Sequence, residues 1–337
     1  MADIRTFGAV PDGTTDCTTA IQTAINAGDI EINNGVFLYS GGVTIPSNRT
    51  VTGKNAILKL ADNSHNNFFR NSDFVNGNSN ITIKGIGNFC FDGNSVNNDD
   101  DYVTYGPVGS ATIYRYQGIA FYKVDTFEIS GINIVDYSHW FFLPQHCTNG
   151  VIGNLHFNYY TVTKNQDGID VAHGCNNIAI SGIKGSVGDD MLVLWASGKG
   201  DAGVRESGWN VGDIHDISID LITLYHSPYH TFITLGGDGN KIYNITGEDW
   251  IVFSCLFFCY FGLTGYYTVA PAKGDVKTMT FDNINVKVSA DTCIKVLEDC
   301  EDITFTNWDN DSGRSDYSEG AGLDVVNFTI NGVDQSV

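Results

Sequence analysis

The chain has 337 residues, of which 42% are hydrophobic and 17% charged, and its formal net charge at pH 7 is −21. This is enough apolar material for a large core, in one long domain or two ordinary ones. The negative charge argues against nucleic acid as a partner, because phosphate binding needs clustered Lys and Arg. It argues less strongly against a polyanionic substrate. Plentiful Gly and scarce Pro, at 38 and 6 residues, favour strands joined by turns.

The first predicted element is a helix over 18–28, with the sequence TTAIQTAINAG. Its apolar residues Ala20, Ile21, Ala24 and Ile25 lie on one helical face, and Gly28 is suited to its end. We expect residues 1–30 to cap the open end of a repeat structure, with a separate small domain as the alternative. The opening MADIRTFGAVPDG lacks the basic start and apolar run of a signal peptide. The chain is therefore either made in a cytoplasm or lacks its leader.

Short stretches that alternate apolar and polar residues follow the helix, each after Asn, Asp or Gly. They start at Asn80, Thr126, Gly150, Asn177, Asp216, Ile242, Thr278 and Asp302. Several starts are roughly 23 to 27 residues apart and others nearer 40, and one such unit cannot bury its own apolar face. Stacked units can, so the pattern predicts an all-β, single-stranded, right-handed parallel β-helix of about ten coils. No Pro/Ser-rich linker interrupts it, so we expect one domain over 1–337.

The eight Cys form no CxxC pair, so a zinc site is not expected, and most lie among apolar residues as small buried side chains. The longest apolar run, at 250–263, is too short to cross a membrane. We interpret it as two buried strands, and no membrane insertion is expected.

Four carboxylates are concentrated in one stretch of the repeat, 165–198: Asp167, Asp170, Asp189 and Asp190. Asp189 follows Asp167 by 22 residues, about one coil, and equivalent positions on adjacent coils lie roughly 5 Å apart. Carboxylates that close cannot all ionise freely, so at least one pKa should be raised. A neutral carboxylic acid beside an ionised one is what hydrolysis of a glycosidic bond requires. Asp170 is expected to point inward or to cap a turn.

Several motifs resemble those of one group of proteins. The opening DIRTFGAVPDGTTDCTTAIQTAI resembles the start of pectin-lyase-like β-helix proteins, including phage tailspikes. NQDGID at 165–170 and GDDMLVL at 188–194 are similar to the Asn-Thr-Asp and Gly-Asp-Asp motifs of polygalacturonases, the family 28 glycoside hydrolases. PYHTFITLGG at 228–237 resembles their Gly-His-Gly segment.

This resemblance implies a polysaccharide substrate and a glycoside hydrolase that inverts the anomeric carbon, endo-acting and without a metal or cofactor. It implies that Asp189 protonates the leaving oxygen and that Asp167 and Asp190 position and deprotonate a water. His230 would tune the acid or hold the substrate.

Polygalacturonases follow the His coil with Arg-Ile-Lys, which binds a substrate carboxylate. The next coil here reads SCLFFCYFG and has no cation, and Lys295 lies about one coil further on. We therefore expect a substrate other than polygalacturonate, such as a neutral or amino-sugar polymer. Lys295, Tyr229, Trp195 and His173 are the candidate substrate-binding residues. The stretch 97–117 lacks the repeat pattern and is expected to be a loop beside the substrate groove.

Two other functions fit the same scaffold. A polysaccharide lyase or epimerase would bind Ca²⁺ through Asp167, Asp189 and Asp190, and it would need a base such as Lys184, Lys199 or Arg205. A non-catalytic glycan-binding tailspike module is the third hypothesis. A tailspike depolymerase would act outside the cell, on a phage virion or as a secreted protein whose leader is absent here, as a monomer or a homotrimer.

Overall fold

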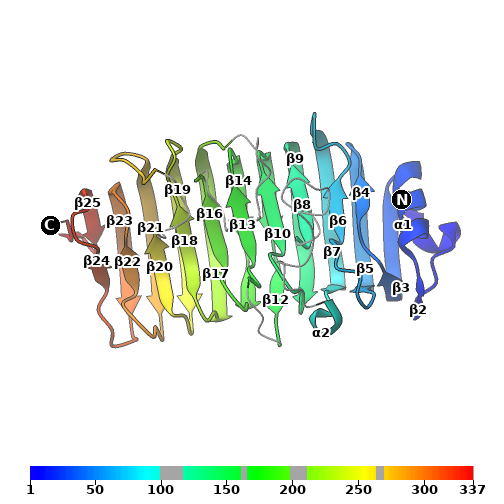
Figure 1. The fold of residues 1–337 in the computed structure, drawn as a ribbon. Coiled ribbons are helices and arrows are strands. Elements are labelled where there is room, and N and C mark those ends of the chain that lie inside the picture. Colours follow the sequence, from blue (N-terminus) through cyan, green and yellow to red (C-terminus); the bar gives the residue numbers. More distant parts are fainter. Residues whose placement is uncertain (99–116, 161–164, 198–210, 263–268, 337) are drawn as a thin grey trace.

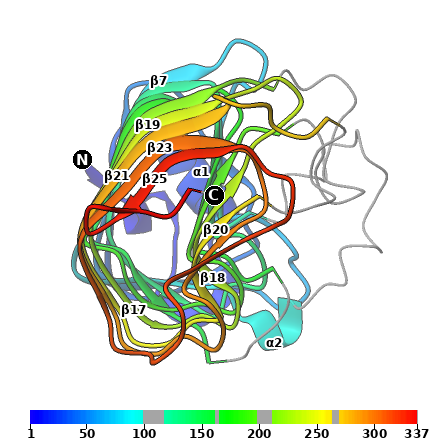
Figure 2. The same ribbon diagram turned by 90° about the vertical axis from the view of Figure 1, so that its left-hand side faces the viewer.

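The computed structural model describes residues 1–98, 117–160, 165–197, 211–262 and 269–336. The chain winds into a solenoid whose coils follow one another from the N-terminal to the C-terminal end (Figure 1). Sheet A, the larger of two sheets, wraps around two faces of the solenoid, and sheet B closes the third (Figure 2). Almost every strand pair is parallel, so the predicted parallel β-helix is confirmed.

Sheet A contains β1 (Ala2–Asp3), β2 (Asp12–Asp16), β3 (Ile30–Tyr39), β5 (Arg49–Leu60), β7 (Asn78–Asp92), β9 (Val124–Val135), β11 (Thr148–Gly153), β12 (His156–Asn158), β14 (Asn176–Ser181), β15 (Lys184–Ser186), β17 (Ile214–His226), β19 (Ile242–Val252), β21 (Val276–Val286), β23 (Cys300–Asn310), β25 (Val325–Ile330) and β26 (Val333–Asp334). Sheet B contains β4 (Val43–Ile45), β6 (Phe69–Asn71), β8 (Ile119–Tyr122), β10 (Phe142–Gln145), β13 (Ile169–Ala172), β16 (Leu192–Trp195), β18 (His230–Leu235), β20 (Phe257–Phe261), β22 (Ile294–Val296) and β24 (Tyr317–Glu319). The helices are η1 (Ile4–Phe7), α1 (Thr18–Ala27) and α2 (Ser95–Asn98).

The predicted capping helix is present as α1, which lies across the N-terminal end of the solenoid (Figure 1). Its residues Ile21, Ala24 and Ile25 are buried, and Ala20 packs against the same core. The open end of the apolar core is thereby covered, as a solenoid requires.

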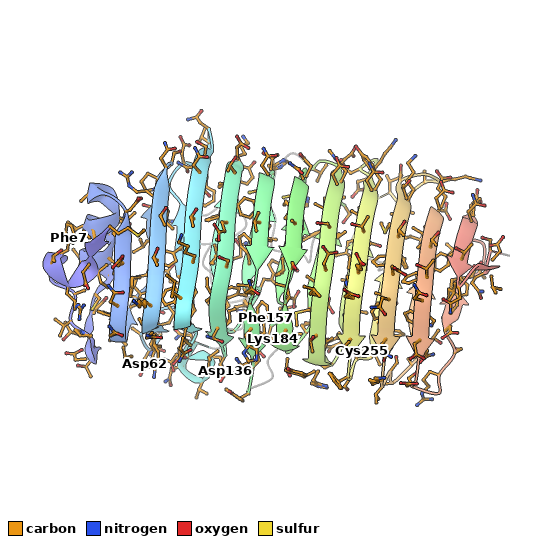
Figure 3. All side chains as sticks on the ribbon, turned by 180° about the vertical axis from the view of Figure 1, so that it is seen from behind. Phe7, Asp62, Asp136, Phe157, Lys184 and Cys255 are labelled. Carbon is orange, nitrogen blue, oxygen red and sulfur yellow. The ribbon has the colours of Figure 1, made fainter. Side chains whose placement is uncertain are left out.

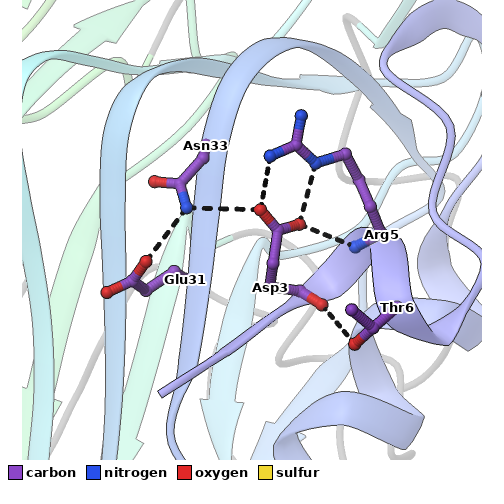
Figure 4. Close-up of polar contacts among 5 residues, drawn as sticks. All are labelled: Asp3, Arg5, Thr6, Glu31 and Asn33. Carbon is purple, nitrogen blue, oxygen red and sulfur yellow. Dashed lines mark hydrogen bonds and ion pairs between the residues drawn. The ribbon is translucent and has the colours of Figure 1, made fainter.

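Polar contacts hold the first turn of the chain against the first long strand (Figure 4). Asp3 Oδ1 accepts hydrogen bonds from the backbone N–H and from Nε of Arg5, each at 2.9 Å. Asn33 on β3 donates to Asp3 Oδ2 at 3.3 Å and to Glu31 Oε2 at 3.0 Å, while Thr6 donates to the Asp3 carbonyl. The Arg5 hydrogen bonds lower the pKa of Asp3 to about 2, so this contact remains ionised at neutral pH.

The long strands of sheet A turn corners at residues with left-handed backbone. Asn80, Thr126, Asn177, Asp216, Thr278 and Asp302 have φ between +52° and +63°. Each is the first residue of one of the repeated stretches in the sequence. Asn and Asp adopt this conformation more readily than other non-glycine residues, which explains their place at the start of the repeats.

Alternate residues of each strand point into one continuous core. Aromatic side chains stack there from coil to coil, with the rings of Phe281 and Phe305 centred 4.8 Å apart and nearly parallel. All eight Cys are buried, as predicted for most of them, and none forms a disulfide. The apolar run at 250–263 contributes the end of β19 and the whole of β20, also as predicted. No helix among the described residues has the length and apolar character needed to cross a membrane.

Candidate active site

Three of the candidate side chains occupy equivalent positions on three neighbouring coils of sheet B. The parallel register places Ile169, Leu192 and Phe232 opposite one another. Asp167, Asp190 and His230 each lie two residues before these positions, at the edge where the chain enters sheet B. Because neighbouring strands are about 4.8 Å apart, residues far apart in sequence form one patch. The patch predicted from the coil spacing is therefore present.

Asp190 and His230 form a tight pair. Asp190 Oδ1 accepts the backbone N–H of His230 at 3.0 Å and lies 2.7 Å from its Nδ1. The carboxylate therefore contacts both the backbone N–H and the Nδ1 atom of His230. The ring of His230 stacks on Phe257 with centroids 5.6 Å apart and meets the ring of Tyr260 edge-on at 4.6 Å. These contacts fix the imidazole and the carboxyl group that it binds.

Asp189 directly precedes Asp190 and, like Asp190, is partly exposed. Its Oδ2 accepts the backbone N–H of Asn165 at 2.9 Å. Its backbone is held on both sides, because its N–H donates to the Gln166 carbonyl at 3.2 Å and its carbonyl accepts the Ser227 hydroxyl at 2.6 Å. The side chain is accessible from outside while its backbone is fixed.

Asp167 and Asp170 are buried, with only 5% and 3% of their surface exposed. Burial raises the pKa of Asp167 well above its ordinary value, and neighbouring carboxylates raise it further, Asp170 first. Burial is also the main cause of the raised pKa of Asp170, followed by the charge of Asp190. The two carboxyl groups share a hydrogen bond that raises the pKa of Asp167 and lowers that of Asp170. The predicted rise of at least one pKa is present at this pair.

The expectation for Asp170 was wrong. Ile169 and Val171 on either side of it belong to the core inside the solenoid, so Asp170 points to the outer face of sheet B. Its cross-strand neighbour there is Val193, which belongs to an outer apolar cluster with Trp195 and Ile233. This apolar surrounding explains the desolvation of Asp170. The signal was in the sequence, because an Asp between two core residues of a strand must face outward.

The candidate substrate-binding residues divide by exposure. Tyr229 is 44% exposed, and its ring is centred 6.3 Å from that of His230. Trp195 and His173 are 4% and 3% exposed, with rings 5.1 Å apart, so they offer little surface to a sugar in this conformation.

Lys295 lies on β22, two strands beyond His230 in sheet B. Its ammonium sits over Phe257 and Tyr260, 5.1 and 5.8 Å from the ring centroids. Both of these rings contact His230, so Lys295 borders the patch without being part of it.

The residues named for the alternative lyase are placed less favourably. Lys184 lies on β15 in sheet A and not in sheet B, while Lys199 and Arg205 lie outside the described residues. The expected loop at 97–117 also falls almost entirely outside them. Within the described part of the chain, no group of three or more His, Cys, Asp or Glu is arranged to hold a metal ion.

A family model described as glycosyl hydrolases family 28 matches residues 24–235, which is more than half of the chain and includes the whole patch. The chain belongs to family 28 of the glycosyl hydrolases. The resemblance inferred from its motifs is therefore confirmed. Solved structures share the fold, including an exopolygalacturonase from Thermotoga maritima with a TM-score of 0.65 at 17% identity, over 98% of this chain and 92% of that one. An endo-xylogalacturonan hydrolase from Aspergillus tubingensis has a TM-score of 0.64 at 16% identity, over 96% and 91%.

Phage proteins are also similar to this family 28 chain. The pre-neck appendage protein of Bacillus phage phi29 is 34% identical over 98 residues, which is 27% of this chain and 11% of the phage protein. That of Bacillus phage B103 is 36% identical over 97 residues, with the same coverage. The aligned segment thus spans about a tenth of the length of these curated relatives. The N-terminal fragment of phi29 gene product 12 has a TM-score of 0.57 at 16% identity, over 99% of this chain and 67% of that one.

Proposed function

We propose that the chain is a glycoside hydrolase that cleaves a polysaccharide at internal bonds with inversion. The observation that carries the proposal is the alignment of Asp167, Asp190 and His230 on three adjacent coils, with the partly exposed Asp189 directly before Asp190. These are the family 28 motif residues of the sequence. These aligned residues run along the solenoid from coil to coil. This arrangement suits a long polymer that extends beyond the site on both sides of the bond that is cleaved.

In this mechanism Asp189 donates a proton to the glycosidic oxygen as the bond from that oxygen to the anomeric carbon breaks. Asp190 removes a proton from a water that attacks the opposite face of the anomeric carbon. The products are a new reducing end with inverted configuration and a released hydroxyl. The partial exposure of Asp189 supports its role, because a general acid must reach the leaving oxygen.

Asp167 positions the water in this proposal, and His230 orients Asp190. The contact from Nδ1 to Oδ1 at 2.7 Å supports the second assignment. The raised pKa values of Asp167 and Asp170 imply that the two carboxyl groups hold a proton between them. That proton reduces the negative charge beside Asp189 and Asp190. The hydroxyl oxygens of a sugar are therefore repelled less when the sugar approaches the two carboxyl groups.

The proposed substrate is a neutral or amino-sugar polymer. The strand after His230 presents Phe257, and not a cation, at the position equivalent to His230 in the register. Lys295 is the nearest strand-borne cation in sheet B on that side, and it is one coil further away.

The phage appendage relatives favour a second candidate function, in which the chain binds a glycan on a host surface without cleaving it. Their names describe a virion part and no enzyme. With either function, we propose that the chain belongs to a phage virion and meets its glycan outside the cell, as a monomer or a homotrimer.

One experiment separates these functions. The protein is incubated with polygalacturonate, xylan, mannan, chitosan and cell-wall polysaccharide from Bacillus subtilis, and new reducing ends are counted. We expect release from at least one polymer, and a loss of about 10²–10⁴-fold for Asp189→Asn with unchanged folding, because an amide cannot donate the proton. Binding without new reducing ends would favour the second function. A rate in Asp189→Asn above about a tenth of wild type would remove Asp189 from the acid role.

A further inference from the structure

The exposed aromatic side chains gather at one place. Among the described residues, four aromatic side chains rank as exposed: Tyr160 at 78%, Tyr225 at 47%, Tyr229 at 44% and Phe253 at 44%. All four lie at the corner where the chain passes from sheet A into sheet B. This corner is the lower edge of Figure 3, where Asp136 and Cys255 are labelled. The other described aromatic side chains are buried or half-buried. The shared location of the four exposed rings therefore needs a physical explanation.

The four residues lie on three coils, and the coil of β15 between Tyr160 and the other three carries no aromatic residue at this corner. Tyr160 comes two residues after β12, in the turn that leads towards Asp167. Tyr225 lies at the end of β17 and Tyr229 immediately before β18. Phe253 follows β19, and because Leu224 pairs with Val252, it is aligned with Tyr225. Their rings are centred 5.8 Å apart. The row crosses three strand spacings, about 14 Å.

The row is continuous with the candidate active site. The hydroxyl of Ser227 accepts the backbone N–H of Tyr229 at 3.1 Å and donates to the carbonyl of Asp189 at 2.6 Å. The turn that carries Tyr225 and Tyr229 is thereby tied to the proposed acid. A ligand that lies on these rings would therefore reach Asp189 without crossing another element of the fold.

The chemistry of the row indicates its ligand. Aromatic rings left in water are unfavourable, and a line of them beside a site marks a binding surface. Sugar rings have flat C–H faces that pack on aromatic rings while their hydroxyls stay in water. Lys287 is the cation next to Phe253. Its Nζ atom is 2.6 Å from Oδ2 of Asp311, so its charge is already paired. The row suits a neutral pyranose chain better than an acidic one.

We propose that Tyr160, Tyr225, Tyr229 and Phe253 form a glycan-binding track that holds several consecutive neutral sugars of the polymer beside Asp189. This proposal rests on the proposed function for the identity of the polymer. A protein partner or a second copy of the chain is the competing occupant, because an exposed aromatic row can also serve an interface.

The test compares the double variant Tyr225→Ala/Phe253→Ala, the single variant Tyr160→Ala and the control Tyr243→Ala. Tyr243 is a half-exposed aromatic on sheet A that stacks on His215, away from the row. Binding to the five polymers is measured by affinity electrophoresis in an Asp189→Asn background, so that no polymer is cleaved. The KM and kcat of the same variants with Asp189 intact are measured on any polymer that is cleaved.

We expect the double variant to bind the recognised polymer roughly ten- to a hundredfold more weakly, and Tyr160→Ala roughly two- to tenfold more weakly. KM should rise with kcat nearly unchanged, because the track binds ground state and transition state alike. Tyr225→Phe should retain wild-type affinity, since the ring remains. The control should match wild type.

The outcomes distinguish the two proposals. Cleavage by wild type with unchanged affinity in the double variant would overturn the track and leave the hydrolase standing. Binding that is lost in the double variant, in the absence of any cleavage, would support the track and overturn the hydrolase. A double variant that changes the oligomeric state measured by light scattering and not the glycan affinity would identify an interface between copies. No binding and no cleavage with any of the five polymers would overturn both.

Discussion

Burial in this fold disfavours the ionised form of the Asp170 carboxyl group. It is buried on the outer face of sheet B opposite Val193, and it shares a proton with Asp167. A carboxyl group whose pKa is raised by folding binds its proton more tightly in the native state than in the unfolded chain. The stability that this provides is complete below the unfolded pKa, near 4, and is lost as the pH rises through the folded pKa.

The substitution Asp170→Asn should therefore flatten the decline in the free energy of unfolding between pH 4 and pH 7. It should also move the pH profile of kcat/KM to lower pH, because Asp167, which positions the water in the proposed mechanism, loses a neighbouring carboxylate that raises its pKa. Urea denaturation and initial rates at several pH values measure the two effects. Asp302→Asn, at an exposed carboxylate in sheet A, is the control. A pH profile identical to that of wild type would show that the pair does not act on the reaction.

Asp167 and Asp190 were predictable from the coil spacing, whereas His230, 40 residues after Asp190, was identified through its motif. Asp167 and Asp190 are 23 residues apart, one coil with a short turn, and the strand register confirms their alignment. The bond from Asn165 to Asp189 was not predictable, since it depends on the conformation of a turn. The binding role of Tyr229, Trp195, His173 and Lys295 stays a prediction. The burial of Trp195 could not be read from its sequence neighbours, because the apolar cluster around it comes from five different strands.

At the scale of elements, the repeated stretches marked most sheet A strands from β7 to β23, whereas β3 and β5 were not identified from the sequence. The sequence marks β14 and β17 by alternation and by the Asn or Asp that starts each repeat. It does not mark where a long strand breaks, as between β14 and β15. Nor does it mark where the backbones of neighbouring coils approach closely, as they do within β15. Gly185 in β15 has φ +127°, and a Cβ built on it would lie 1.9 Å from the Phe157 carbonyl oxygen.

The substitution Gly185→Ala should lower the free energy of unfolding by about 2–4 kcal/mol, because both the backbone conformation and the space exclude a side chain. Gly153→Ala is the matched control on β11, a strand of the preceding coil of sheet A. A Cβ there meets its nearest atom at 3.6 Å, an ordinary contact, so the expected change is within about 1 kcal/mol. Chemical denaturation measures the free energy of unfolding of both variants. Equal decreases in the two variants would mean that β15 adjusts to admit a methyl group.

At the scale of the whole molecule, we expect the net charge to disfavour acidic polymers as substrates. The chain has 39 acidic and 18 basic residues, and several of the basic side chains are already paired, such as Lys273, Lys277 and Lys287. Lys295 forms no ion pair with any residue in the described part of the chain, and it lies over aromatic rings beside His230. A polyanion approaching sheet B therefore meets long-range repulsion and one cation at the border of the patch.

Polygalacturonate should consequently be a poor substrate. An uncompensated sugar carboxylate opposite Phe257 loses a charge-assisted hydrogen bond of roughly 1.5–3 kcal/mol, which lowers kcat/KM about 10- to 150-fold relative to a neutral polymer. Adding salt should narrow this gap, because the screening length falls from about 30 Å at 0.01 M to about 10 Å at 0.1 M. Reducing-end assays at both salt concentrations measure it. Efficient cleavage of polygalacturonate at low salt would contradict the prediction. Comparing Lys295→Ala with Lys277→Ala, a paired lysine on sheet A, would then reveal whether Lys295 supplies the missing cation.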